Sequence, residues 1–524
     1  MHGQKRNEYK ARLKDDATAT KLATKANQWH ILSAEVLRRS ATSTTINASV
    51  NDSTAHTDIK ACMEILKLTD KLLSVNPDPM YLWNRRRQVL LSLLHHDSAT
   101  TTVTTAINTS PNTDSTNNDT STTEGTMNET IFIEQEQILT QNALQRNPKA
   151  YGAWFHRKWS IRHYIQSIGT SSLSSSPSSS SSYTSVFHTI ENLLKAELVL
   201  CKEFLLLDER NFHCWNYRRF IIATLGHYYS YTSSTATPLE VDFGLNTIDG
   251  GWNFLRSMNH NDHQDDNNKS SILTTTINTI GAQLTKSTSI LLSPSSTDTT
   301  TNNTTTTTSQ TETVSNTIIM EKLQQLLENE WNFTTEKIHQ NFSNGSAFHY
   351  RTKLLPLLLW CYNNSHNNDN KTKLDLVREE MELIRNAIFT EPDDQTSWWY
   401  FRFILSWANP LTCSVEDDID DNHREKMNIS MEEYKDLLYE EWNNIQELVE
   451  AEDGQCKWGL LGLYMVAMVF VDLGKNHATA NDDGHISQDE NWLEHAHSYL
   501  EDLKILDPDR ISRYQCMQDE LIRI

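Results

Sequence analysis

Apolar positions in this chain recur at the three- and four-residue spacing of amphipathic helices. Between residues 371 and 389, one helix face would carry an apolar stripe made of Leu374, Val377, Met381, Ile384 and Ile388. A short turn and a second helical segment rich in aromatic residues follow. The same order predicts seven helical pairs, at residues 58–73 with 80–96, 129–146 with 151–168, 189–207 with 212–227, 318–340 with 347–362, 371–389 with 396–407, 431–450 with 457–473, and 489–506 with 509–521.

The second helices of the first five pairs share a short sequence tag. It consists of a polar capping residue, often followed by proline, and then of an aromatic residue with an arginine three positions later. The tag recurs as Trp83 with Arg86, Trp154 with Arg157, Trp215 with Arg218, and Phe348 with Arg351. The fifth copy contains adjacent Trp398 and Trp399, which leaves its register relative to Arg402 open.

The tag suits the start of a helix that packs against its neighbour. Asn or Asp caps free N–H groups, and proline is tolerated at the first helical position. Trp and Arg three residues apart lie on one helix face, so the indole can pack on the preceding helix while the guanidinium reaches a carbonyl or carboxylate. We therefore expect structural roles for Trp83, Arg86, Trp154, Arg218, Phe348, Arg351, Trp398 and Arg402.

Repetition of the tag predicts an all-α solenoid, because one helical pair alone cannot bury its apolar face. We expect a single repeat domain over residues 1–524, interrupted by polar inserts too poor in apolar residues to fold. The inserts are expected at about 97–128, 169–186, 230–315, 363–370, 411–429 and 475–488.

Composition narrows the possible functions. The formal net charge of −22 argues against non-specific binding of nucleic acids. The seven scattered cysteines contain no Cys-x-x-Cys motif, which favours a reducing, cytoplasmic location and makes a self-contained zinc site improbable. The first residues lack the apolar core of a signal peptide. The apolar run at 459–473 is shorter than the ~20 residues that span a bilayer, and predicts a fully buried helix.

The tags resemble the repeats of protein prenyltransferase α subunits. The resemblance is carried by Trp154-Phe155-His156-Arg157, Trp215-Asn216-Tyr217-Arg218-Arg219 and Phe348-His349-Tyr350-Arg351, although that family usually has Trp at the position of Phe348. The subfamily of type II, or Rab, geranylgeranyltransferases is favoured by Met1-His2-Gly3, Asn341-Phe342-Ser343-Asn344, Glu391-Pro392-Asp393-Asp394-Gln395 and Cys456-Lys457-Trp458.

The resemblance implies a right-handed α-α superhelix, shaped as a crescent, that is one half of a heterodimeric enzyme. In that enzyme, the β subunit holds the zinc ion and the pocket for geranylgeranyl diphosphate. The complex transfers geranylgeranyl to C-terminal cysteines of Rab GTPases, which a Rab escort protein presents. No cofactor is expected in the α chain itself.

Lys149 and Tyr151 are the candidate catalytic residues. They stand at the start of a predicted helix, where free N–H groups and the helix dipole favour anions. The resemblance implies that they stabilise the diphosphate leaving group as its negative charge grows. Without the resemblance, they would be interpreted as an exposed turn lysine and a packing tyrosine.

Four further residues have weaker functional signals. Arg157, Asn211 and Trp215 match positions that the family uses near the subunit interface and the diphosphate, but internal packing explains them equally well. His2 matches an N-terminal histidine that can reach the zinc ion of the partner subunit, although a frayed terminus is the simpler interpretation.

Two other functions fit much of the pattern. One is the α subunit shared by farnesyltransferase and type I geranylgeranyltransferase, against which Met1-His2-Gly3 and the fourth and fifth tags argue. The other is a non-enzymatic helical-repeat scaffold that binds proteins, which would not require Lys149 and Tyr151.

Overall fold

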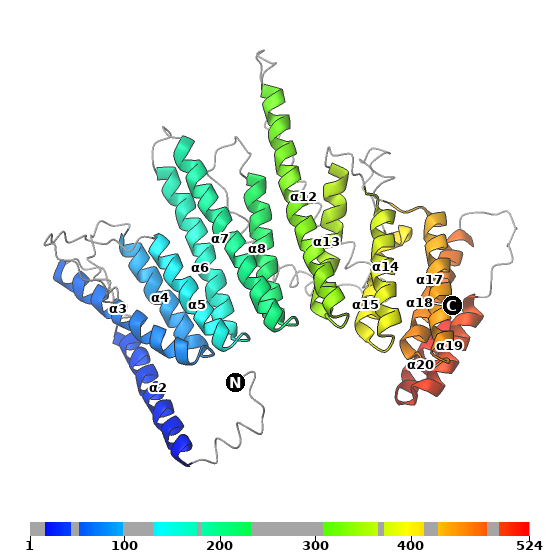
Figure 1. Cartoon of the computed structure of the whole chain (residues 1–524), viewed down its shortest axis with the longest axis horizontal. Helices are drawn as coiled ribbons and strands as arrows, with labels where there is room; N and C mark the ends of the chain where they lie inside the picture. The colour runs from blue at the N-terminus through cyan, green and yellow to red at the C-terminus, as the bar shows by residue number, and fades with distance from the viewer. Residues whose placement is uncertain are drawn as a thin grey trace. The chain divides into compact units, whose positions relative to one another are not determined.

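The computed structural model describes residues 16–42, 52–97, 129–174, 180–231, 308–364, 371–412, 428–478 and 492–522. These ranges contain helices and turns but no β-strand, so the predicted all-α class is confirmed (Figure 1). After α2 (Asp16–Thr42), the helical pairs are α3 (Asp52–Val75) with α4 (Met80–Asp97), α5 (Glu129–Arg146) with α6 (Tyr151–Ser174), α7 (Ser180–Leu207) with α8 (Phe212–Tyr231), α12 (Thr308–Gln340) with α13 (Gly345–Asn364), α14 (Lys373–Thr390) with α15 (Gln395–Ala408), α17 (Met431–Ala451) with α18 (Lys457–Ala478), and α19 (Trp492–Leu506) with α20 (Ile511–Leu521); short 3-10 turns occupy Pro410–Thr412 and Pro508–Arg510.

The chain divides into two compact units, where the sequence predicted one domain. Unit 1 comprises residues 1–221 with 238–240, and unit 2 comprises residues 222–237 with 241–524. The boundary falls inside α8, between Ile221 and Ile222. The predicted crescent concerns the chain as a whole and stays a prediction.

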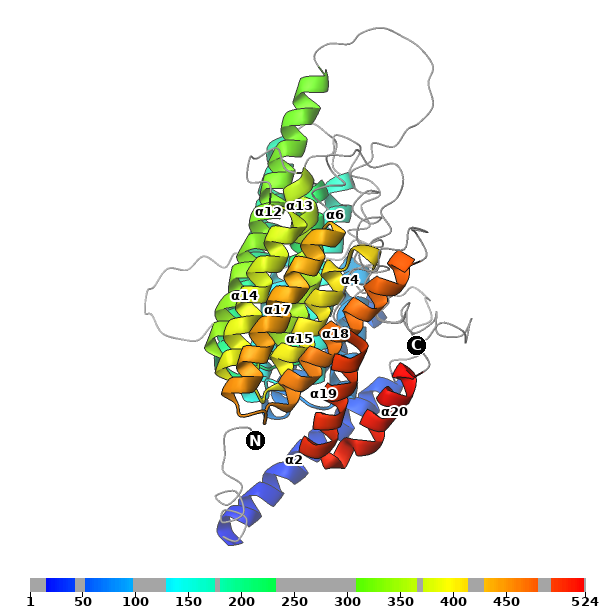
Figure 2. The same ribbon diagram turned by 90° about the vertical axis from the view of Figure 1, so that its right-hand side faces the viewer.

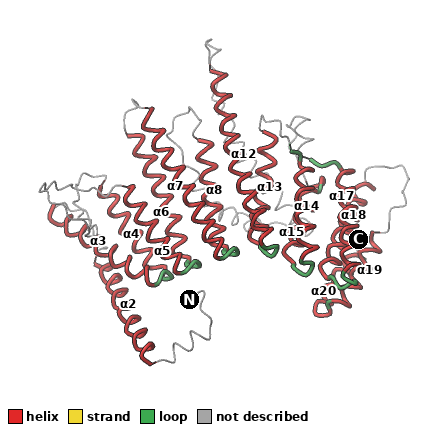
Figure 3. Tube along the Cα trace, viewed as in Figure 1, coloured by secondary structure: helices red, strands yellow, loops and turns green. Residues whose placement is uncertain are grey.

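In each unit, neighbouring helical pairs pack side by side. In unit 1, α3 contacts α5 and α4 contacts α6, so that equivalent helices of successive pairs face one another. The turns between α5 and α6 and between α7 and α8 lie at the same end of their helices (Figure 3). In unit 2, α14, α15, α17 and α18 run alongside one another (Figure 2), and α15 contacts α18.

The tag tryptophans anchor each turn by one repeated hydrogen bond. The indole N–H donates to the carbonyl oxygen six residues earlier, from Trp83 to Pro77, from Trp154 to Pro148 and from Trp215 to Glu209, each at 2.8 Å. Phe348 occupies the same place and is fully buried, but has no N–H to donate. At the tryptophan tags, packing and this bond together hold the start of the second helix against its turn.

The same bond settles the register of the fifth tag. Trp398 donates to the carbonyl of Pro392 at 2.9 Å and is buried, whereas Trp399 is half-exposed. The arginine position is therefore taken by buried Phe401. The structural role predicted for Arg402 is wrong, because this residue lies one position out of register and is exposed.

Some helices extend into ranges for which inserts were expected. α6 continues to Ser174 and α7 begins at Ser180, both within the expected insert at 169–186, and α12 begins at Thr308. Lengthening an existing helix adds a hydrogen bond per residue without a new nucleation step, so polar residues can extend a packed helix. The other expected inserts lie largely outside the described residues.

α18 is the most apolar helix of unit 2. Among the described helices, it alone is long and apolar enough to cross a membrane, over Lys457–Gly474, and 44% of that segment is buried within the protein. At Gly462, a Cβ atom would lie 2.6 Å from the ring of Trp398, so α18 lies directly against this tryptophan. The helix packs as a core helix, but the prediction that it is fully buried was too strong.

Candidate functional site

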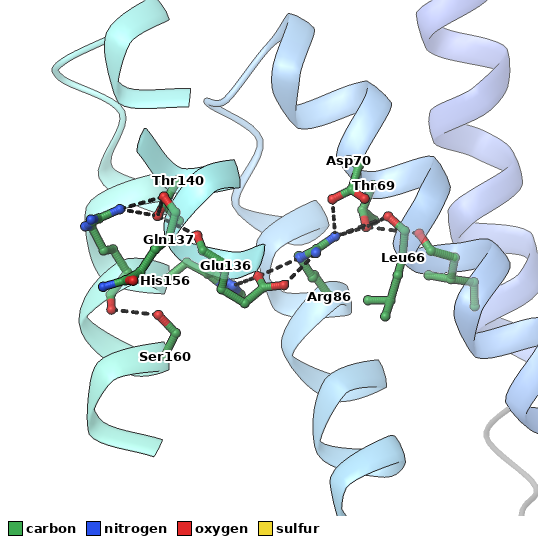
Figure 4. Close-up of polar contacts among 11 residues, drawn as sticks. Leu66, Thr69, Asp70, Arg86, Glu136, Gln137, Thr140, His156 and Ser160 are labelled. Atoms are coloured by element: carbon green, nitrogen blue, oxygen red, sulfur yellow. Dashed lines mark hydrogen bonds and ion pairs between the residues drawn. The ribbon is translucent and has the colours of Figure 1, made fainter. Parts of the chain in front are cut away.

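A buried arginine–glutamate pair joins the first two tagged hairpins (Figure 4). Nε and Nη2 of Arg86 on α4 donate to the two carboxylate oxygens of Glu136 on α5, at 2.7 and 2.6 Å. Nη1 donates to the carbonyl of Leu66 and the hydroxyl of Thr69 on α3, both at 3.1 Å. One guanidinium thereby connects three helices.

The pair recurs along the chain. Arg157 on α6 donates to both oxygens of Glu197 on α7 at 2.6 and 2.7 Å, and to the hydroxyl of Thr140 on α5 at 2.8 Å. In unit 2, Arg351 on α13 binds Glu380 on α14 with two bonds of 2.6 Å. In these three cases, the tag arginine of one hairpin is matched to a glutamate in the first helix of the next.

Glu136 and Glu197 each also accept a bond from the residue before the tag arginine of their own hairpin. His156 Nε2 lies 2.7 Å from Glu136, and the Tyr217 hydroxyl donates to Glu197 at 2.7 Å. Burial alone would raise the pKa of Glu136, but the charge of Arg86 and the bonds from His156 and Arg86 lower it to about 2. Burial also lowers the pKa of His156, so this imidazole is neutral at pH 7.

The pairs Arg86–Glu136, Arg157–Glu197 and Arg351–Glu380 form a ladder between successive hairpins. Two candidate residues lie inside this stack of hairpins. Arg157 and Trp215 are each 2% exposed and are bonded inside the stack of hairpins. Internal packing, which the sequence left open for both, is the arrangement found. Neither side chain is available to a ligand at the surface.

Lys149 and Tyr151 lie together on the surface of unit 1, at the start of α6. The Oδ1 atom of Asn147 accepts the backbone N–H of Lys149 at 3.1 Å and closes the turn. The side chains of Lys149 and Tyr151 are largely exposed, at 51% and 64%. Gly152 permits this placement, because a Cβ atom there would lie 2.3 Å from the Trp83 ring. The helix start is pressed against the preceding hairpin, and its two polar side chains face outward.

The next turn, between α7 and α8, supports both residues from the side. The carboxylate of Asp208 lies 3.4 Å from Lys149 Nζ, and the ring of His213 stands edge-on to Tyr151 with centroids 4.1 Å apart. Burial and the positive charge of Lys149 lower the pKa of His213, so its ring is neutral at pH 7. Sequence reasoning missed Asp208 and His213, because they belong to the following hairpin.

Asn211 connects the two turns. Its Nδ2 donates to the carbonyl of Pro148 at 3.0 Å, while its Oδ1 accepts the N–H groups of His213 and Cys214 at 3.1 and 3.3 Å and caps α8. Asn211 is 1% exposed, so its place is structural support beside the site.

An ammonium and a phenol at an uncovered helix start can bind an anion. The lysine offers three donors and the tyrosine one, and the free N–H groups of the first helical turn add to their field. Within the described ranges, no group of three His, Cys, Asp or Glu side chains could hold a metal ion. His2 lies outside the described residues.

The repeat geometry agrees with comparisons to known proteins. The model of the protein prenyltransferase alpha subunit repeat matches residues 133–164, 194–225, 327–358 and 377–408. Each match runs from the first helix of a hairpin into the second. The chain therefore contains four repeats of the protein prenyltransferase α-subunit family. The hairpin of α3 and α4 has the same anchor bond and guanidinium contacts, although it lies outside these matches.

Known members of this family are similar to the chain over much of its length. The geranylgeranyl transferase type-2 subunit alpha of Homo sapiens is 24% identical over 348 residues, which are 66% of this chain and 34% of the human protein. The protein of the same name from Schizosaccharomyces pombe is 30% identical over 217 residues, 41% of this chain and 54% of the relative. That from Saccharomyces cerevisiae is 20% identical over 356 residues, 68% of this chain and 62% of the relative. The chain therefore spans about a third of the length of the human relative.

Proposed function

We propose that the chain is the α subunit of a type II geranylgeranyltransferase. The enzyme would transfer geranylgeranyl from its diphosphate to C-terminal cysteines of Rab GTPases, which a Rab escort protein presents, in the cytoplasm. The observation that carries this proposal is the outward-facing pair of Lys149 and Tyr151 at the start of α6, the second helix of the family repeat at residues 133–164. The names of the similar proteins support the choice of the type II enzyme.

The proposed role of this chain is to act on the leaving group. Negative charge grows on the diphosphate as its bond to the isoprenoid carbon breaks, and donors aimed at that charge lower the barrier. Lys149 would contribute the positive charge, and Tyr151 a hydrogen bond. The β subunit would hold the isoprenoid and a zinc ion, which would keep the acceptor cysteine of the Rab GTPase in its nucleophilic thiolate form. His2 is proposed to reach that zinc ion in the free heterodimer.

Co-expression with candidate β subunits tests the proposal. With a type II β subunit, we expect a stable 1:1 complex that prenylates a Rab GTPase only when escort protein is added. Pairing only with a farnesyltransferase β subunit would select the shared α subunit instead. A chain that pairs with neither β subunit would be better described as a repeat scaffold without enzymatic activity.

A further inference from the structure

The first residue of the turn within a hairpin is an aspartate, Asp208, between α7 and α8, whereas three other hairpins have an asparagine there. In four turns, the Oδ1 atom of the first turn residue accepts the backbone N–H two residues later. The four bonds run from Asp78 to Asn76 at 3.2 Å, from Lys149 to Asn147 at 3.1 Å, from Arg210 to Asp208 at 3.3 Å and from Ser343 to Asn341 at 2.8 Å. Because asparagine makes this bond at three of the four turns, the fold of the turn does not require the charge of Asp208.

The other polar atom of this side chain, Nδ2 in asparagine or Oδ2 in aspartate, can contact the turn of the preceding hairpin. The Nδ2 atom of Asn147 donates to Asp78 at 2.6 Å. At the next turn, the Oδ2 atom of Asp208 reaches the equivalent position, which is Lys149, at 3.4 Å. The link thus joins equivalent positions in both turns, but here it is an ion pair between a carboxylate and the ammonium of the candidate catalytic lysine.

We propose that Asp208 is a positioning residue for Lys149, an inference that rests on the proposed function. A lysine side chain has four rotatable bonds, and an exposed ammonium samples many positions. The ion pair with Asp208 at 3.4 Å restricts the region that the ammonium samples, and its N–H donors can still reach the oxygens of a diphosphate. Both side chains are partly exposed, so the pair adds little to folding stability, and its effect falls on the placement of the ammonium.

The variant Asp208→Asn removes the negative charge of this side chain and keeps the conformation of the turn. The amide keeps the turn bond that Asn76, Asn147 and Asn341 make, and loses the attraction to Lys149. In the full-length chain, we expect an amine-acylating reagent to modify Lys149 about twofold faster or more in this variant. Modification of Lys202, an exposed lysine on α7, is the internal reference and should be unchanged.

Single-turnover prenylation by the heterodimer tests the catalytic consequence. We expect Asp208→Asn to lower the rate constant about three- to tenfold, because a misplaced donor stabilises the transition state less well. The KM for geranylgeranyl diphosphate should stay within about twofold, because the ammonium itself remains. In the Lys149→Ala background, Asp208→Asn should cause no further loss. Asp78→Asn makes the same chemical change one turn away and should retain the wild-type rate.

Two kinetic results would overturn the proposal: a wild-type rate for Asp208→Asn, or a full additional loss in the Lys149→Ala background. Unchanged acylation of Lys149 in Asp208→Asn would also overturn it, since the ion pair would then not restrain the amine. If the wild-type heterodimer transfers no isoprenoid, the proposed function falls together with the positioning role. Faster acylation of Lys149 would still reveal the ion pair in that case, which distinguishes the two failures.

Discussion

Arg86 on α4 and Glu136 on α5 form a doubly bonded ion pair that is almost completely buried, with N–O distances of 2.7 and 2.6 Å. Removing one member of such a pair typically costs about 3–5 kcal/mol, because the other charge is left without compensation. A shift of one of these hairpins along the other would separate the pair and leave both charges without compensation. The ladder of pairs therefore determines which helix of one hairpin faces which helix of the next.

The stability contributed by Glu136 should depend on acidity. Its pKa is lowered from 4.5 to about 2 in the folded chain, so its contribution is present above pH 4.5 and is lost as the pH falls toward 2. Glu136→Gln should lower the free energy of unfolding by roughly 3 kcal/mol at neutral pH. The difference from the wild type should shrink steadily below pH 4.5.

Urea unfolding of both chains at a series of pH values measures this difference. Glu379→Gln is a suitable control, because its ion pair with Lys371 is exposed on both sides. That variant should change stability little at any pH. A constant difference between wild type and Glu136→Gln across the acid range would contradict the assigned role.

Glu441 on α17 should show the opposite pH dependence. It is buried, and its partner is Arg385 of α14 at 2.7 Å, while the arginine position of the fifth tag holds Phe401. Burial raises the pKa of Glu441 above 4.5, and the bond and charge of Arg385 offset this only in part. Its contribution to stability is thus present below pH 4.5 and is lost as the pH rises through the folded pKa.

Replacement of Glu441 by glutamine removes this titration. We expect the stability of Glu441→Gln to improve relative to the wild type as the pH rises from 4.5 to neutrality, in the same urea experiments. The two glutamate variants then have pH slopes of opposite sign. Slopes of the same sign would mean that the surroundings of Glu441 do not differ from those of Glu136 in the way described.

Two variants separate the contribution of the Trp154 ring to stability from that of its N–H group. Trp154→Phe keeps most of the ring and removes the bond to the carbonyl of Pro148, which should cost about 1 kcal/mol. Trp154→Ala also empties a buried site and should cost about 3–5 kcal/mol. Phe348 shows that phenylalanine is accommodated at this position of the repeat. Equal losses in the two variants, measured by chemical unfolding, would assign the whole effect to the hydrogen bond.

The tags predicted the helical pairs and the buried aromatic anchors, because both depend on residues close together in the sequence. The glutamates of the ladder were missed, because Glu136 and Glu197 lie in helices without a tag and meet their arginines only when hairpins stack. The error at Arg402 has a related cause. Two adjacent tryptophans fit the pattern equally well, and only burial and the bond to Pro392 distinguish them.

The candidate site was predicted in the same incomplete way. Lys149 and Tyr151 could be found from the start of their own helix, and both are exposed there. Asp208 and His213 lie about sixty residues later and reach the site only because α8 begins beside α6. The spacing of residues along the sequence of one hairpin does not predict which side chains of the next hairpin they contact.

Loss of the Lys149 ammonium is expected to slow the proposed reaction rather than weaken substrate binding. Removing one donor from developing negative charge lowers kcat about 10²–10³-fold in comparable sites. We therefore expect Lys149→Ala to lower kcat of the heterodimer at least about tenfold, with a much smaller change in the KM for geranylgeranyl diphosphate. Lys202→Ala is the matched control, since Lys202 is an exposed lysine of the same unit within α7, outside the turn. It should retain wild-type kinetics, whereas an unchanged kcat in Lys149→Ala would remove this lysine from the leaving-group site.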